Sequence, residues 1–265
     1  MLDLIHAIDP LYVLSGVLVG ALVGFTGVGG GSLMTPLLIL VFGVHPASAV
    51  GTDLLYAGIT KTAGSAVHHR YKNIDWNIVG LLALGSIPMT ILTIWALFSL
   101  GIDSKAVQHL ISRVLGVALL LTAASLFFRT TMMRFAQRRI GTLDSRRVSG
   151  LTVATGAVLG VLVTISSVGA GAIGVMALVL LYPKMESQRI VGSDIAHAVP
   201  LTLLAGLGHS ILGTIDLHIL VSLLCGSLPA IVIASIATAR TPEKVVRIAL
   251  ASVLLLVCAR FWLMP

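Results

Sequence analysis

The chain has 265 residues, of which 57% are hydrophobic and 10% are charged, and it carries a net charge of +7. Because a soluble domain needs a polar surface and normally has about a quarter charged residues, this composition excludes an ordinary soluble protein. It predicts a chain whose exterior faces lipid. The positive charge does not indicate a nucleic-acid partner, since six arginines gather in residues 129–147, between apolar runs. Basic loops of this kind lie on the cytoplasmic side of membrane proteins.

Apolar runs follow one another along the chain, each at least about the 20 residues that a membrane-spanning helix needs. Two of them are too long to be single unbroken helices, and glycines interrupt both: Gly27–Gly31 in the first, Gly169 and Gly171 in the second. Clustered glycines destabilise a helix interior, so they predict a break in each long segment. The expected segments are residues 11–42, 46–67, 76–98, 107–128, 149–181, 188–211, 217–238 and 244–263.

An internal repeat organises these segments. Residues 50–88 align without a gap on residues 191–229, with twelve of 39 positions identical. The matched positions include Asp53 and Asp194, and a Gly-Ser-x-Pro motif in each copy. We therefore predict an all-α integral membrane protein of two homologous four-segment halves, residues 1–128 and 148–265. The arginine-rich loop, residues 129–147, joins them on the cytoplasmic side.

The distribution of basic residues favours inverted halves. If each glycine-broken segment crossed the membrane fully, Lys184, Arg189, Arg240 and Lys244 would lie outside. If each is instead a re-entrant pair of half-helices, these residues join the arginine-rich loop on the cytoplasmic side, as the positive-inside rule prefers. Inverted repeats are common in secondary transporters. A parallel arrangement of the halves stays open at this point.

Matched breaks in two halves are the best sequence pointer to a transporter's substrate site. Broken helices expose backbone N–H groups that hydrocarbon cannot satisfy, and a helix N-terminus favours an anion. The expected anion-binding residues are Gly29, Gly30, Gly31 and Ser32 in the first half, and Gly169 and Gly171 in the second. The alternative is that these glycines only allow close helix packing.

Polar residues after each break extend this prediction. The hydroxyls of Thr52 and Ser193 can donate to an anion, and each precedes an aspartate. Because ionised Asp53 and Asp194 would repel an anion, proton coupling is the more plausible role for them. His197 lies three residues after Asp194, hence on the same helix face, and can form a relay with it. Alternatively, the aspartates cap helix ends at the membrane interface.

Two cations lie within apolar runs. Lys61 and Arg113 would offset the charge of a permeating anion, or they snorkel to the membrane surface with their long side chains. No motif for ATP hydrolysis, metal binding or a dinucleotide cofactor stands in a suitable context, so neither a metal nor a cofactor is expected.

The combination of motifs resembles one family. The chain reads Gly-Val-Gly-Gly-Gly-Ser from Gly27, Val-Gly-Thr-Asp-Leu at 50–54, His-His-Arg-Tyr-Lys-Asn-Ile-Asp-Trp from His68, and Gly-Ser-Ile-Pro from Gly85, with a weaker second copy. This pattern resembles the sulfite exporter TauE/SafE family over about residues 11–263. The resemblance implies a prokaryotic plasma-membrane permease for sulfite, a sulfonate such as sulfoacetate, or a related organosulfur anion.

Three function classes are weighed against one another. A secondary transporter explains the paired breaks and the acids, whereas a passive anion channel needs no proton site. An intramembrane enzyme would need a nucleophile or metal motif that the sequence lacks. The expected partners are a small anion and membrane lipid, with a homo-oligomer left open. Which anion is carried, and in which direction, is not given by these residues.

Overall fold

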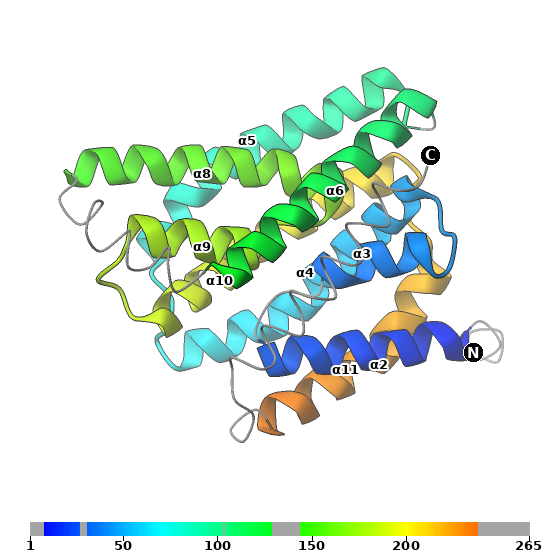
Figure 1. Ribbon diagram of the computed structural model, residues 1–265, viewed down its shortest axis with the longest axis horizontal. Coiled ribbons are helices and arrows are strands. Elements are labelled where there is room, and N and C mark those ends of the chain that lie inside the picture. The colour runs from blue at the N-terminus through cyan, green and yellow to red at the C-terminus, as the bar shows by residue number, and fades with distance from the viewer. Residues whose placement is uncertain (1–7, 27–30, 103, 129–143, 238–265) are drawn as a thin grey trace.

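The computed structural model describes residues 8–26, 31–102, 104–128 and 144–237, and in these ranges the chain is helical (Figure 1). Glycine or proline lies in several of the turns between helices, as expected from their low helix propensity. The helices are α2 (Pro10–Thr26), α3 (Gly31–Leu40), α4 (Pro46–Arg70), α5 (Trp76–Leu100), α6 (Lys105–Phe127), α8 (Ser145–Ser166), α9 (Ala172–Leu181), α10 (Ser187–Ile211) and α11 (Leu217–Ala237).

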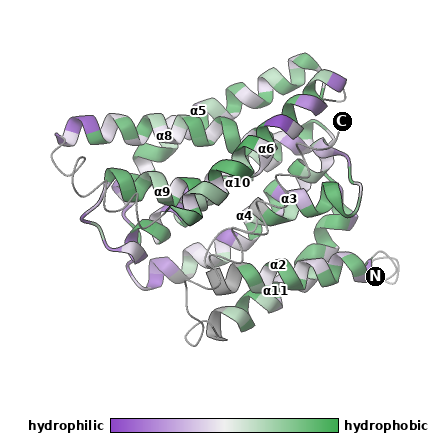
Figure 2. Ribbon diagram, viewed as in Figure 1, coloured by the Kyte–Doolittle hydropathy of each residue, from purple (hydrophilic) through white to green (hydrophobic). Residues whose placement is uncertain are grey.

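The all-α prediction is confirmed for the described residues, and each helix falls within or close to an expected apolar run. Among the described residues, five helices are long and apolar enough to cross a membrane: α5, α6, α8, α10 and α11. Figure 2 shows hydrophobic residues along most of the ribbon. The run 244–263 and the first glycine break, residues 27–30, lie outside the described residues.

In both halves, the short second helix ends close to the point where the first helix began. Tyr12, at the start of α2, packs on Phe42, just after α3, with ring centroids 4.6 Å apart. Thr152, in the first turns of α8, hydrogen-bonds over 2.8 Å to the hydroxyl of Tyr182, just after α9. Tyr12 and Thr152, like Phe42 and Tyr182, are corresponding positions in the two halves. The same folding-back therefore occurs twice.

The two halves pack crosswise, because the first helix of each contacts a later helix of the other. The closest pairs are α2 with α11 and α5 with α8. Glycine makes both contacts possible: the Cα of Gly85 faces the backbone of Val153 and Ala157, and that of Gly226 faces the backbone of Val13 and Val17. Small residues at a helix interface let two backbones approach closely, which is how membrane helices associate.

The long helices α4 and α10 pack against each other at the centre of the molecule (Figure 1). Two matching hydrogen bonds tie them to the helices of the opposite half. The Asp216 amide donates to the Thr52 hydroxyl over 3.0 Å, and the Asp75 amide donates to the Ser193 hydroxyl over 2.8 Å. Because α4 is central, it can carry polar residues that a lipid-facing helix of the same length could not.

The aspartates directly before α5 and α11, Asp75 and Asp216, cap these helices. The Asp75 carboxylate accepts hydrogen bonds from the amides of Asn77 and Ile78, and that of Asp216 accepts one from the Ile219 amide. Asp75 also forms an ion pair with Arg189 at 3.2 Å. Each cap satisfies amide groups that the first turn of a helix leaves without a partner.

Loss of the Arg189 ion pair is expected to change stability little. Arg189→Ala should lower the free energy of unfolding by less than about 1 kcal/mol, because the Arg189 side chain is 45% exposed and exposed pairs contribute little. Thermal unfolding of the detergent-solubilised protein at low and high salt measures this. A loss well above that amount would show that the pair holds α10 against α5 more firmly than its exposure suggests.

Candidate functional site

The second glycine break is a sharp turn between two buried helix ends. Helix α8 ends at Ser166, Ser167 has a left-handed backbone with φ 58°, and Gly169 and Gly171 both have φ 129°. A φ of this kind favours glycine, since other residues would be strained there. Helix α9 then begins at Ala172, and its N-terminus points into the protein interior. The predicted break is therefore present.

Lys61 of α4 reaches this break. Its ammonium donates a hydrogen bond over 3.0 Å to the carbonyl of Ala170, and the side chain is only 7% exposed. Lys61 therefore does not extend to the protein surface. A break in a helix frees backbone carbonyls that need donors inside the membrane, and a buried lysine is one such donor.

Asp53 lies on the same helix as Lys61, two turns earlier, and is completely buried. Its carboxylate accepts a hydrogen bond from the hydroxyl of Thr35 on α3. The Ser167 hydroxyl lies close enough to interact with it, although the two make no hydrogen bond of good geometry. Asp53 thus lies between α3 and the start of the second break.

Asp194 occupies the equivalent position on α10 and is also buried. One carboxylate oxygen packs directly against the Cα of Gly174 in α9, so that a side chain at this glycine would overlap it. The backbone N–H of Gly171 lies nearby, and neither carboxylate oxygen makes a hydrogen bond of good geometry with a described residue. Asp194 therefore faces the N-terminus of α9, where a negative charge is favoured.

These three side chains form one electrostatic group, here called the Asp–Lys–Asp cluster: Asp53, Lys61 and Asp194. The Lys61 ammonium interacts with both carboxylates. Among the described residues, the aspartate and lysine side chains that are buried are these three. With all three ionised the cluster carries a charge of −1, and each proton bound by a carboxylate raises this charge by one.

The expected relay residue is also buried beside the cluster. The Nε2 atom of His197 lies 2.8 Å from the Ser86 hydroxyl of α5, and Lys61 is close enough to act on the imidazole. His209, in contrast, is occupied at both ring nitrogens, by the Thr214 hydroxyl and the Thr164 carbonyl, each at 3.0 Å. His209 therefore has a structural role, joining α10 to the loop that follows it and to α8.

Other residues singled out from the sequence lie elsewhere. The hydroxyls of Thr52 and Ser193 accept the hydrogen bonds between the halves, and that of Ser193 also donates to the Arg189 carbonyl over 2.7 Å. Arg113 is exposed on α6, away from the cluster. Gly31 is the first residue of α3, whereas Gly29, Gly30 and the side chain of Ser32 lie outside what the structure describes.

Sequence reasoning missed three hydroxyl residues near the cluster: Thr35, Ser86 and Ser167. Only Ser86 had a signal, because it belongs to the repeated Gly-Ser-x-Pro motif. Thr35 and Ser167 lie in apolar segments where one hydroxyl is unremarkable, since it can bond to its own helix backbone.

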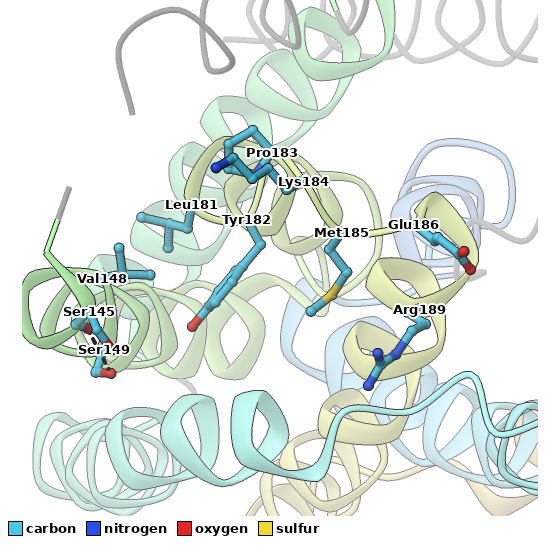
Figure 3. Close-up of a pocket in the computed structure, with 10 residues that line it drawn as sticks. All are labelled: Ser145, Val148, Ser149, Leu181, Tyr182, Pro183, Lys184, Met185, Glu186 and Arg189. Carbon is cyan, nitrogen blue, oxygen red and sulfur yellow. Dashed lines mark hydrogen bonds between the residues drawn. The ribbon is translucent and has the colours of Figure 1, made fainter. Parts of the chain in front are cut away.

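A separate cavity of about 620 Å³ lies at one end of the molecule, where α8 begins and α9 ends. In Figure 3 the Tyr182 ring points toward α8, while Glu186 and Arg189 lie at the opposite side. No residue of the Asp–Lys–Asp cluster lines this cavity, so the cavity and the cluster are separate. Its lining is Ser145, Val148, Ser149, Leu181, Tyr182, Pro183, Lys184, Met185, Glu186 and Arg189.

The fold and this cluster define a class: a helical multi-pass membrane protein with charged groups buried beside a helix break. Comparison with known proteins agrees with this class. The family described as sulfite exporter TauE/SafE matches residues 12–261. The chain is 39% identical over 246 residues to the probable membrane transporter protein YjnA of Bacillus subtilis (strain 168), covering 92% of this chain and 95% of that protein.

Two further relatives carry similar descriptions. The probable membrane transporter protein YdhB of Bacillus subtilis (strain 168) is 25% identical over 244 residues, which is 91% of this chain and 94% of the relative. A probable membrane transporter protein of Xylella fastidiosa (strain 9a5c) is 30% identical over 114 residues, or 43% and 42% of the two chains. No solved structure matches the chain significantly.

The chain belongs to the sulfite exporter TauE/SafE family of membrane transporters. The resemblance seen in the sequence motifs is thereby confirmed. The curated relatives are named as membrane transporters rather than as enzymes.

Proposed function

We propose that this protein is a secondary transporter that moves a small sulfur-containing anion across a prokaryotic plasma membrane, coupled to protons. The substrate would bind at the Asp–Lys–Asp cluster, beside the N-terminus of α9. One observation carries the proposal: two acids at equivalent positions of the two halves share a single buried lysine at a helix break. Ionisable groups within a membrane segment are functional candidates by default, because burying them is costly.

The charge of the cluster explains why proton coupling goes with an anion. When both carboxylates are ionised the net charge is −1, which repels an anion. One proton makes the cluster neutral, and a second leaves the Lys61 ammonium in excess. Because Coulomb interactions are strong in a low-dielectric interior, anion affinity should rise steeply with each bound proton. Binding of the anion and of protons is then reciprocally linked.

The sulfur-anion class rests on family membership together with the site's chemistry. Sulfite and sulfonates are compact anions with several acceptor oxygens. The cluster region offers the donors that such oxygens need: the Lys61 ammonium, the hydroxyl of Ser167 and the N-terminal amides of α9. Helix N-termini bind anions of this kind through their N–H groups and their dipole.

We further propose that the halves are inverted in the membrane and that each broken segment is re-entrant. The contacts between Tyr12 and Phe42, and between Thr152 and Tyr182, support this, since in each half the short helix returns to the end where the segment began. In Figure 1, α2 and α8 also run in opposite directions. With the start of α8 on the cytoplasmic side, Lys184 and Arg189 face the cytoplasm, as the positive-inside rule prefers.

A passive anion channel is the competing function. A channel needs a continuous polar path, and a net negative cluster in that path would hinder anions unless it is protonated. Buried acids matched in the two halves are better explained by alternating access, in which both sides of the membrane reach one central site.

Ligand binding to the purified protein tests the proposal directly. Among sulfite, sulfate, thiosulfate, sulfoacetate and taurine, at least one anion is expected to raise the apparent melting temperature, with a larger shift at pH 5.5 than at pH 8. A ligand at about a hundredfold excess over its Kd stabilises the folded state by about 2.7 kcal/mol. Acetate and malonate serve as carboxylate controls.

Two glycine variants link this shift to the cluster. Gly174→Ala should abolish the shift, because the added Cβ would overlap the Asp194 carboxylate. Gly64→Ala on α4 is the matched control, since its nearest neighbour atom would be 3.7 Å away. The site assignment fails if Gly174→Ala folds and still shows the full shift. The substrate class fails if a carboxylate or a cation stabilises the protein and no sulfur anion does.

A further inference from the structure

The repeat produces two equivalent triads of polar groups, and each triad is shared by one helix from either half. One triad is Asp194 and His197 of α10 with Ser86 of α5. The other is Asp53 and Tyr56 of α4 with Ser227 of α11. All six side chains are buried. The triads differ at one member, a histidine against a tyrosine.

In the triad of Asp194, His197 and Ser86, one hydrogen bond is formed and other polar atoms have no hydrogen-bond partner among the described residues. The Ser86 hydroxyl and His197 Nε2 are 2.8 Å apart, which is a formed hydrogen bond. The other imidazole nitrogen, Nδ1, has no hydrogen-bond partner among the described residues, and neither oxygen of Asp194 makes a bond of good geometry. Because Asp194 and His197 are three residues apart on one helix, they share a face. Two groups with unused hydrogen-bonding capacity therefore lie side by side.

In the triad of Asp53, Tyr56 and Ser227, one oxygen of Asp53 is held by a hydrogen bond, whereas its other oxygen has none of good geometry. Asp53 already accepts a hydrogen bond from Thr35, for which the second half offers no equivalent. The Tyr56 hydroxyl lies near Ser227, but neither forms a hydrogen bond of good geometry. A phenol ordinarily titrates near pH 10, whereas an imidazole titrates near neutrality and exchanges protons through its two nitrogens. Tyr56 therefore cannot hold an extra proton at physiological pH, whereas the His197 imidazole can.

We infer that the proton coupled to transport passes along Ser86, His197 and Asp194, and that the triad of Asp53, Tyr56 and Ser227 does not carry it. This rests on the proposed function. The Ser86 hydroxyl delivers an incoming proton to one ring nitrogen of His197. The proton on the other ring nitrogen then passes to the Asp194 carboxylate. The imidazole ends neutral, and Asp194 becomes a neutral acid.

Few other charged groups face this relay. Helix α4 brings Lys61 and Asp53, and the Lys61 ammonium acts on both Asp194 and His197. Helices α5 and α9 contain no charged residue, and α8 carries only Arg146 and Arg147, at its start. Protonation of Asp194 leaves the Lys61 ammonium with Asp53 as its one ionised carboxylate, so the ammonium can interact more strongly with an arriving anion.

The repeat supplies a matched pair of variants, Ser86→Ala and Ser227→Ala, that remove the same hydroxyl from corresponding positions. Purified proteins in liposomes would be assayed with radiolabelled sulfoacetate in two ways: uptake driven by a pH gradient, and exchange without a gradient. Ser86→Ala should lower the driven rate about tenfold more than the exchange rate, as loss of a proton-transfer group does. Ser227→Ala should leave that ratio, and the pH profile of uptake, within about twofold of wild type.

Rescue by Ser86→Thr separates a relay from a packing role, because threonine keeps the hydroxyl. If it restores the driven rate while Ser86→Ala retains its melting temperature, the hydroxyl itself carries the effect. The inference is overturned if Ser86→Ala and Ser227→Ala change the ratio equally, or if His197→Gln keeps the wild-type pH profile. Failure of the wild type to exchange or take up any sulfur anion would instead overturn the proposed function.

Discussion

Replacing Lys61 by methionine is expected to abolish transport and to lower the free energy of unfolding by about 3–5 kcal/mol at neutral pH. Methionine keeps the length of the side chain but leaves Asp53 and Asp194 buried without a cation. It also leaves the Ala170 carbonyl without its donor. Uptake into liposomes and thermal unfolding in detergent measure the two effects.

A second substitution distinguishes charge from packing. The double variant Lys61→Met, Asp194→Asn has one unbalanced buried charge instead of two. Much of the stability lost in Lys61→Met should therefore return, while transport should stay absent. Stability of the single variant should also recover as the pH falls, because protonated carboxylates no longer need a cation. A single variant that is as stable as wild type at pH 8 would contradict the electrostatic account of the cluster.

Gly85→Ala is expected to force α5 and α8 apart and to destabilise the fold by about 1–3 kcal/mol or more, as overpacking does. The new Cβ would overlap the Val153 carbonyl and would lie 2.7 Å from the Ala157 amide nitrogen. Both are backbone atoms, so neither can move by changing a side-chain rotamer. Thermal unfolding and the yield of monodisperse protein measure the loss.

Gly80→Ala provides the matched control on the same helix. A Cβ at Gly80 would meet nothing within 4 Å, and alanine favours a helix over glycine by about 1 kcal/mol, so this change should be neutral or stabilising. Gly226→Ala, at the corresponding position in the second half, should cost about as much as Gly85→Ala. Unequal losses would show that the two crosswise contacts differ in strength.

Much of the fold could be predicted because the membrane leaves few choices. A span has to satisfy its backbone within one helix, so apolar length alone places most helices. Gly169 and Gly171 marked the second break correctly, since their positive φ excludes most other residues. The crosswise pairing of α2 with α11 was not predicted. Repeats show which segments are equivalent, but not whether a segment packs on its own half or on the other.

The site was predicted less completely, because burial of a polar side chain depends on three-dimensional packing. Asp53 and Asp194 were singled out by their matched positions, but nothing in the sequence joined them to Lys61, which snorkelling explained equally well. Thr52 and Ser193 were expected to donate to an anion. In the structure their hydroxyls accept hydrogen bonds from the amides of Asp216 and Asp75, and whether either also contacts substrate stays a prediction.

The crosswise pairing has a consequence for how the protein is made. Helix α2 is synthesised early but waits for α11, whose first residue is synthesised about 190 residues later; at about 5–20 residues per second this takes about 10–40 s. Neither half completes its own interfaces, so neither should be stable when expressed alone. Each half completes the helix interfaces of the other, as the two subunits of an isologous dimer do.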